Sequence, residues 1–246
     1  MKLTRLEPFA LANHGLVTFV SVQRAGISKS TWFRAIHDRT IEQLHPGVAR
    51  LLGSPPTREQ LIASAVLAGG AGAMASHRSA AYLWGIPRPA TDPPEIILPV
   101  RSRQATLVGV EVHRPRDRKD LSPVLRANIR CSNILRLLCD LGAVDRAAVN
   151  AAVGHVLFAG LASPRSLGAA ISVHARQGRH GVPALRDALA DWMIDDKPAD
   201  SLLETAMNEL VMTHALPPVE FHALVEGPRS RLLGRRQGSV AHKSGR

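Results

Sequence analysis

Glycine and proline divide the first fifty residues into segments so short that they fit only a small helical domain with a hairpin. The helical segments are residues 8–15, 18–26 and 27–39. Gly15 and Gly26 end the first two, because glycine is the residue that helix ends favour. Residues 40–52 alternate around Pro46-Gly47, which predicts a hairpin. Helix, helix, glycine turn, helix and hairpin together predict a winged helix-turn-helix over residues 1–53.

The third helical segment has the pattern of a helix that could enter the DNA major groove. Ser28 is a natural N-cap, and Trp32 and Ile36 share one face. Lys29, Phe33, Arg34 and His37 point elsewhere, and Arg39 and Arg50 flank the hairpin. The predicted DNA-binding residues are Ser28, Lys29, Ser30, Thr31, Arg34, His37, Arg39 and Arg50. The pattern alone also allows a small helical domain used for protein contacts.

The positive charge lies at the two ends of the chain. The net charge is +11 over 246 residues. Residues 1–53 contribute seven Lys or Arg and three acids, a net +4, and residues 227–246 contribute six Lys or Arg and no acid. The remaining middle carries only +1. Any anionic partner is therefore expected at the ends, and the prediction of nucleic-acid binding depends on the +4 of residues 1–53, not on the +6 of the tail.

Composition indicates a globular protein of the reducing cytoplasm. Hydrophobic residues make up 45% of the chain and aromatic residues only 4%, so the core must consist mainly of Ala, Leu, Val and Ile. The two cysteines, Cys131 and Cys139, form no CxxC pair and no disulfide framework. We find no apolar run that could span a bilayer and predict no membrane partner.

Residues 54–195 read as a mixed α/β core, and 194–200 as an acidic linker. Strands are predicted at residues 93–100 and 107–115, and helices at 58–70, 73–87, 134–144, 145–160, 163–178 and 181–193. Residues 201–217 read as an amphipathic helix and 219–226 as a strand. The predicted fold class is thus α+β: a winged helix-turn-helix, a mixed core, a truncated helix–strand element at 200–226 and a disordered basic tail at 227–246.

No residue cluster in the sequence indicates a metal, a cofactor or a catalytic site. The eleven histidines form no dense ligand pattern. We interpret Ser76 as a helix cap and His77-Arg78 as a surface or interdomain pair. Leu83, Trp84 and Ile86 are expected in the core or at a domain interface. The sequence therefore predicts no enzyme, no cofactor and no metal.

Several segments, in one order along the chain, resemble the AbiEi-type antitoxin family. SHRSAAYLWGIP at 76–87 is similar to the family's "SHRSAAALWGL", and ISKSTWFRAI at 27–36 resembles the third helix of its winged domain. HPGV at 45–48 falls at the family's wing turn. Weaker matches are PEIILPV, VEVHRP, CSNILRLLCDLGAV and GRHGVPALRDAL. The resemblance extends from residue 8 to about residue 226.

The resemblance implies an antitoxin-like repressor. Proteins of this family bind DNA through the winged domain and repress their own operon. They oppose a nucleotidyltransferase-type toxin in type IV toxin–antitoxin or phage-defence systems. The implied partners are double-stranded DNA of the chain's own promoter and a toxin of that type.

A second reading is that the chain is a truncated, inactive member of the branch with an endonuclease-like domain. Many relatives carry a C-terminal domain of the restriction or very-short-patch-repair type, which opens with "S-x-L-E". SLLE at residues 201–204 resembles that opening, with Glu204 at the family's first helical acid. The match stops at Gly227, and after Glu226 there is no Asp or Glu. A hydrolytic site of this type needs two or three carboxylates around a divalent ion.

Overall fold

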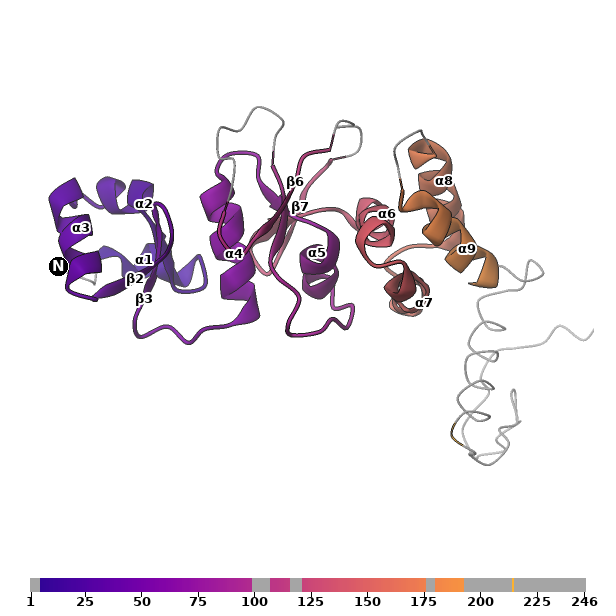
Figure 1. Cartoon of the computed structure of the whole chain (residues 1–246), viewed down its shortest axis with the longest axis horizontal. Coiled ribbons are helices and arrows are strands. Elements are labelled where there is room, and N and C mark those ends of the chain that lie inside the picture. The colour runs from indigo at the N-terminus through magenta and orange to yellow at the C-terminus, as the bar shows by residue number, and fades with distance from the viewer. Residues whose placement is uncertain (1–4, 99–106, 116–120, 176–179, 193–213, 215–246) are drawn as a thin grey trace, which may run out of the picture. The chain divides into compact units, whose positions relative to one another are not determined.

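The computed structural model describes residues 5–98, 107–115, 121–175, 180–192 and 214. The chain divides into two compact units, residues 1–196 and 197–246. All the helices and strands below belong to the first unit (Figure 1). The predicted helix–strand element at 200–226 and the tail at 227–246 lie outside the described residues, apart from His214.

The N-terminal region has the predicted order of helices and hairpin, with one additional strand. Its elements are α1 (Glu7–Leu11), β1 (Leu16–Thr18), α2 (Phe19–Arg24), α3 (Lys29–His37), β2 (Ile41–His45) and β3 (Val48–Leu51). β3 pairs antiparallel with both β1 and β2, so the sheet order is β1-β3-β2. The arrangement is consistent with the predicted winged helix-turn-helix, in which β2 and β3 form the hairpin.

Local sequence signals explain where α2, α3 and the hairpin begin and turn. Thr18 and Ser21 form a capping box at the start of α2, each side chain accepting from the other residue's backbone N–H. Ser28 Oγ accepts from Thr31 N at 3.3 Å at the start of α3. Gly47 has a φ of 77° in the turn between β2 and β3, a conformation that glycine adopts without steric cost.

A small apolar cluster holds these elements together. Its buried residues are Leu6, Ala10, Val17, Val22, Trp32, Ala35, Ile41 and Ala49. Trp32 is only 2% exposed, and Phe19 meets its ring edge-on at 5.9 Å between centroids. Because Trp32 is on α3, the same residue fixes which face of that helix is turned inward.

The mixed core follows after residue 54. Its elements are α4 (Arg58–Gly69), β4 (Met74–Ala75), α5 (His77–Leu83), β5 (Glu95–Ile97), β6 (Glu111–His113), β7 (Val124–Arg126), β8 (Ile129–Cys131), α6 (Ile134–Val144), the 3₁₀ turn η2 (Arg146–Ala148), α7 (Val149–Phe158), α8 (Pro164–His174) and α9 (Val182–Trp192). The sheet order is β6-β5-β4-β8-β7. β4 runs parallel to β8 and antiparallel to β5, and β5 runs parallel to β6.

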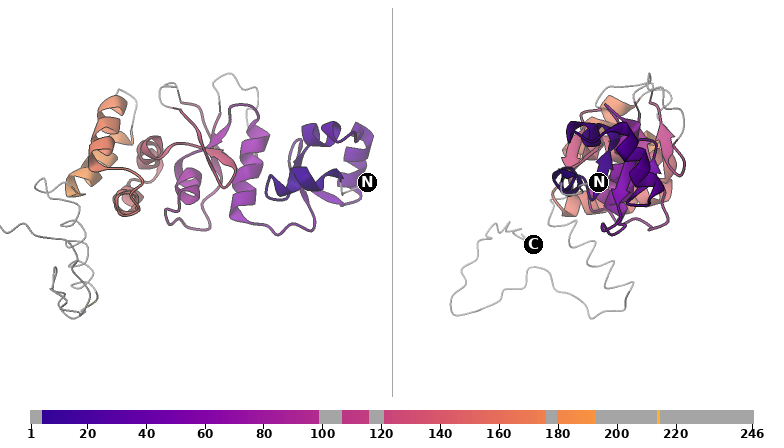
Figure 2. Two further views of the ribbon diagram at one scale, coloured as in Figure 1. Left: turned by 180° about the vertical axis from the view of Figure 1, so that it is seen from behind. Right: turned by 90° about the vertical axis from the view of Figure 1, so that its left-hand side faces the viewer.

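The five-stranded sheet lies between helices. α4 covers one face and α5 the other, with α6 packed against α5 (Figures 1 and 2). α7, α8 and α9 pack with α6 into a helical layer beyond α5. The chain is thus a mixed α/β protein, as the sequence predicted.

Two glycines let α6 and α9 approach closely. Gly142 lies within α6, and Gly181 directly precedes α9. A Cβ at Gly181 would lie 1.8 Å from the carbonyl oxygen of Cys139, and one at Gly142 would lie 2.6 Å from the carbonyl oxygen of Gly181. These are main-chain atoms, so no side-chain rotation could relieve the overlap. The packing therefore requires the absence of a side chain at both positions.

The core differs from the sequence prediction chiefly in its strands. The predicted helices at 58–70, 134–144, 163–178 and 181–193 and strands at 93–100 and 107–115 are confirmed within the described residues. β4 and the β7–β8 hairpin were not predicted. The hairpin turns through Ala127 and Asn128, with φ of 45° and 59°. Within the described residues, no helix is both long and apolar enough to cross a bilayer.

Candidate functional site

The outward face of α3 brings together most of the predicted DNA-binding side chains. Trp32 and Ala35 are buried, which turns the other side of the helix to solvent. The exposed residues on that side are Lys29, Ser30, Phe33, Arg34 and His37. Their spacing places them along one continuous stripe. No acid occurs between Lys29 and His37, so the stripe is uniformly basic or neutral.

Hydroxyl groups surround the N-terminus of α3. Ser28 Oγ shares hydrogen bonds with Ser30 Oγ and Thr31 Oγ1, both at 2.9 Å, and it also caps the helix. Ser28 and Ser30 are exposed, whereas Thr31 is half-buried. The hydroxyls therefore order one another, and Ser30 is the one that lies on the exposed stripe.

The two arginines predicted to contact the DNA backbone differ in their surroundings. Arg39 is exposed in the turn after α3, with a φ of 53°. Arg50 on β3 forms an ion pair with Glu42 on the neighbouring strand β2. The Arg50 side chain is only 19% exposed, and its Nε is buried without a hydrogen-bond partner. Arg39 is thus available to a phosphate, while Arg50 already faces a carboxylate.

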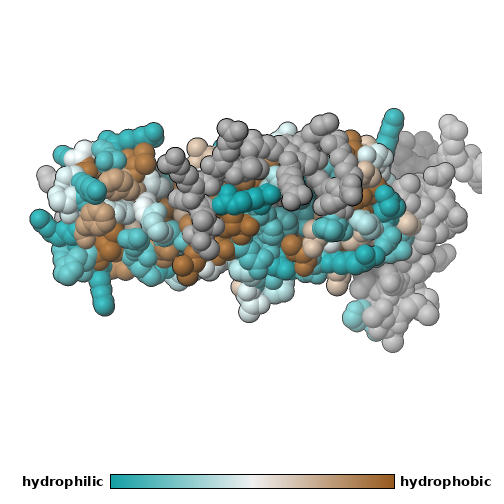
Figure 3. All heavy atoms as spheres, turned by 45° about the horizontal axis from the view of Figure 1, so that its top comes forward, coloured by the Kyte–Doolittle hydropathy of each residue, from teal (hydrophilic) through white to brown (hydrophobic). Residues whose placement is uncertain are grey.

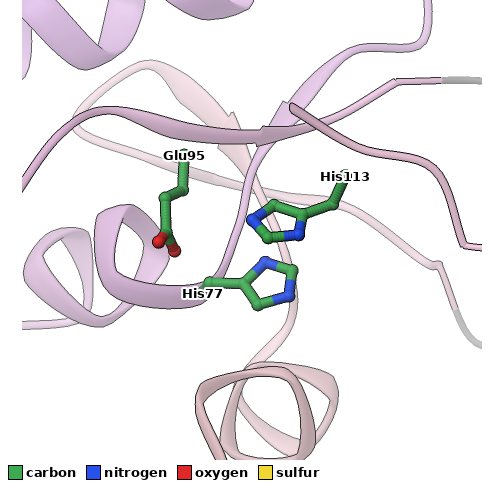
Figure 4. Close-up of side chains that lie close together, drawn as sticks. All are labelled: His77, Glu95 and His113. Carbon is green, nitrogen blue, oxygen red and sulfur yellow. The ribbon is translucent and has the colours of Figure 1, made fainter. Parts of the chain in front are cut away.

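A second polar site, which the sequence analysis did not find, lies between α5, β5 and β6. His77 and Glu95 are buried and His113 is partly buried (Figure 4). The sequence predicted a surface or interdomain position for the His77-Arg78 pair, and the surface alternative is wrong for His77, because only 6% of it is exposed. Its φ of 48° is a conformation that residues other than glycine rarely adopt.

Glu95 rather than Ser76 caps α5. Ser76 occupies the N-cap position but makes no side-chain cap bond, and its Oγ lies 2.9 Å from His77 Nδ1. The Glu95 carboxylate instead accepts from Arg78 N at 2.8 Å. It also pairs with the Arg78 guanidinium at 2.5 Å. A carboxylate at a helix N-terminus is favoured by the helix dipole.

Burial sets the charge states of this cluster. Burial, with the nearby charges of His113, Arg136 and Arg78, lowers the pKa of His77 to about 2. Burial also lowers the pKa of His113. Both rings are therefore neutral at pH 7, and they stack at 3.6 Å between centroids. Burial raises the pKa of Glu95 to about 7, with Glu111 nearby as a second carboxyl group.

The donor set of the cluster is one that metals use, but its geometry does not fit an ion. One ligand atom each from His77, Glu95 and His113 lies within 4.8 Å of the others. The two imidazole planes are inclined by only 21°, however, so their in-plane lone pairs run side by side instead of converging. The Arg78 guanidinium also occupies the Glu95 carboxylate. We therefore interpret the cluster as a polar network that joins α5, β5 and β6.

The remaining chemical candidates are parts of the core. Cys131 and Cys139 are buried free thiols, and burial raises the pKa of Cys131 to about 12, so it is not a nucleophile. Ile86 is buried as predicted. Trp84 is partly buried; its Nε1 donates to Ser132 O at 2.9 Å, and the Arg126 guanidinium lies 4.2 Å from its ring.

The comparisons with known proteins show no family for this chain. No family model matches the chain, and no curated protein matches it. Among solved structures it is similar to the one titled "Crystal structure of RV2827C protein from Mycobacterium tuberculosis". That likeness has a TM-score of 0.48 and 16% sequence identity, over 82% of this chain and 80% of the other. It carries no argument about function.

Proposed function

We propose that this protein is a DNA-binding, antitoxin-like repressor that contacts the major groove with α3. The observation that carries the proposal is the outward stripe of α3, where Lys29, Arg34 and His37 are exposed and no acid is present. The buried Trp32 holds this stripe outward. A rigid basic helix of this kind is the element that reads bases in many DNA-binding domains.

The side chains on the stripe have distinct roles in this proposal. Arg34 has the planar donor pair that matches O6 and N7 of guanine. Lys29 and Ser30, at the first turn of the helix, suit phosphate or base contacts. Arg39, just after the helix, suits a phosphate of the adjoining backbone. His37, at the last turn of α3, is the other exposed donor on the stripe.

The regulatory part of the proposal is supported by the sequence resemblance described above. We propose that the chain represses its own promoter and has a nucleotidyltransferase-type toxin as partner in the cytoplasm. It would have no catalytic activity and need no cofactor. The alternative of an inactive endonuclease-like protein concerns residues 200–226, which, apart from His214, lie outside the described residues, and no described contact favours it.

A gel-shift titration on DNA from upstream of the protein's own gene tests the proposal. We expect the logarithm of the association constant to fall linearly with the logarithm of the salt concentration. The slope should be about −0.9 for each phosphate contacted. The double variant Lys29→Ala, Arg34→Ala should bind about tenfold more weakly or worse. Its salt slope should be shallower by about one for every phosphate contact that is lost.

A matched variant controls for the loss of two positive charges. Arg165 on α8 and Arg186 on α9 are also exposed. Arg165→Ala, Arg186→Ala changes the net charge equally and should leave binding within about twofold of the unaltered protein, since surface charges far from a contact act weakly. Equal binding by the two double variants would contradict the assignment of α3.

A further inference from the structure

Phe33 is a large aromatic side chain at the middle of the exposed stripe of α3. It is 53% exposed. The chain has only five phenylalanines, so an exposed one is notable. Lys29 Nζ lies 5.9 Å from its ring centroid, and Arg34 and His37 follow it on the same side of the helix. Phe19 is partly buried, and its ring packs edge-on against Trp32; Phe158 is 48% exposed, but its ring packs edge-on against Trp192. Phe33 is thus more than half exposed, with the Lys29 ammonium group beside its ring.

The position of Phe33 distinguishes it from an ordinary exposed apolar residue. Single hydrophobic side chains on a surface are common and need no explanation. The forward face of residues 5–53, at the left of Figure 3, mixes hydrophobic with hydrophilic side chains. Phe33, however, follows Lys29 by one turn and directly precedes Arg34. Any nucleic acid that these two cations bind would therefore meet the ring as well.

The major groove offers one kind of apolar group to such a ring. The C5-methyl group of thymine projects into the groove, and phenylalanine is among the residues that contact it. Cytosine methylated at C5 carries the same group at the same ring position. Wedging between base steps is instead a device of proteins that bind the minor groove. An α-helix that lies in the major groove would bring Phe33 to the methyl groups.

We propose that Phe33 recognises the 5-methyl group of a pyrimidine in the bound DNA, and so makes recognition depend on thymine or 5-methylcytosine. The inference rests on the proposed function of α3. Lys29 and Arg34 would supply phosphate and guanine contacts, and Phe33 the apolar contact between them. Burying one methyl group against the ring corresponds to about a fourfold gain in affinity.

The test compares three versions of one promoter fragment by gel shift. The first is unmodified, the second has deoxyuridine in place of every thymidine, and the third has 5-methylcytosine in place of every cytosine. For the unaltered protein we expect about fourfold weaker binding to the uracil fragment for each thymine methyl contacted. If the contacted methyl belongs to methylated cytosine, we expect a similar gain on the third fragment.

Variants of the stripe separate this contact from changes in DNA shape. Phe33→Ala should bind the three fragments with affinities within twofold of one another. Arg34→Ala should bind each fragment more weakly but keep the ratio of affinities that the unaltered protein shows between them. Phe33→Leu, which retains an apolar side chain, should keep part of the ratio. A thermal melt by circular dichroism checks that the variants are folded.

Two negative results have different meanings. Equal binding of the unaltered protein to all three fragments would overturn the role of Phe33 and leave the DNA-binding function intact. The same holds if the ratio between fragments persists in Phe33→Ala. Absence of binding to any fragment would overturn the proposed function itself, and the role of Phe33 with it.

Discussion

At the scale of single residues, position in space changes what His77 can do. In the sequence it stands between Ser76 and Arg78 and looks like a surface residue. In the fold it is buried, bonded to Ser76 and stacked on His113, 36 residues away along the chain. Its pKa of about 2 follows from that burial and from the nearby cations.

The lowered pKa of His77 predicts a loss of stability in acid. An unfolded chain protonates this histidine below about pH 6.5, whereas the folded chain keeps it neutral down to about pH 2. The unfolded state then binds more protons, so the free energy of unfolding falls by up to about 1.4 kcal/mol per pH unit below pH 6. His113 acts in the same direction, because its pKa is also lowered.

Urea unfolding between pH 7.5 and 5 measures this effect. His77→Phe keeps a ring for the stack and removes the titrating group, so its unfolding free energy should depend less on pH, by about 1 kcal/mol per pH unit at pH 5 to 6. Glu95 opposes the histidines, because its raised pKa means that the folded state binds the extra proton between pH 4.5 and 7. Glu95→Gln should therefore steepen the loss in acid. Equal pH dependence in His77→Phe and the unaltered protein would refute the buried, neutral state.

Residue-level prediction from sequence succeeded where the partners are neighbours in the chain. Ser28 caps α3 as predicted, because the bonded N–H lies three residues on, and Thr18 caps α2 in the same way. Thr57 likewise accepts from Gln60 N, but the Gln60 side chain donates to His14 O, 46 residues away, instead of closing a capping box. Glu95 caps α5 from another strand, which no local pattern reveals.

At the scale of elements, contacts between residues far apart in the sequence explain why the β7–β8 hairpin was not predicted. Its turn residues Ala127 and Asn128 both have positive φ, as a two-residue type I′ turn requires. Asn suits that conformation, but Ala does not, so the usual Asn-Gly signal is absent. The turn is anchored by tertiary contacts: the carbonyl of Ala127 accepts from His14, and Asn128 donates to the carbonyl of Ala12.

The α6–α9 contact gives an element-scale prediction. Gly181→Ala would place a methyl group against the main chain of α6, and the strain should lower the free energy of unfolding by roughly 3 kcal/mol or more. Gly168 on α8 is the matched control, because a Cβ there meets nothing within 4 Å. Gly168→Ala should be neutral or should stabilise the protein by up to about 1 kcal/mol.

Thermal and urea unfolding of the two alanine variants would check the packing. The expected order of stability is Gly168→Ala first, the unaltered protein equal or slightly below it, and Gly181→Ala far below both. A Gly181→Ala variant as stable as Gly168→Ala would show that α6 and α9 do not approach in this way.

At the scale of the whole molecule, the charge has two separate sources. Residues 227–246 carry +6 of the net +11, and residues 1–53 carry +4. Both would attract nucleic acid without regard to sequence. Of the two sources, the α3 stripe belongs to the described residues and has a geometry that could read bases, whereas the basic tail lies outside them.

Deleting residues 227–246 separates the two sources. Affinity for unrelated DNA should fall, because six cations are removed, and its dependence on salt should become shallower. The ratio of affinities for promoter and unrelated DNA should remain within about twofold, because base contacts set that ratio. If the shortened protein bound promoter and unrelated DNA equally well, the tail and not α3 would recognise the sequence.

The ion pair between Arg50 and Glu42 has a consequence for how the hairpin would meet DNA. Glu42 acts as a built-in counterion, since it already neutralises the guanidinium that a phosphate would approach. A phosphate at Arg50 would exchange one anion for another, and fewer mobile cations would leave the DNA than a free arginine releases. The hairpin is in this sense pre-neutralised. The affinity that it contributes through Arg50 would depend little on salt concentration, whereas the affinity that α3 contributes would depend on it strongly.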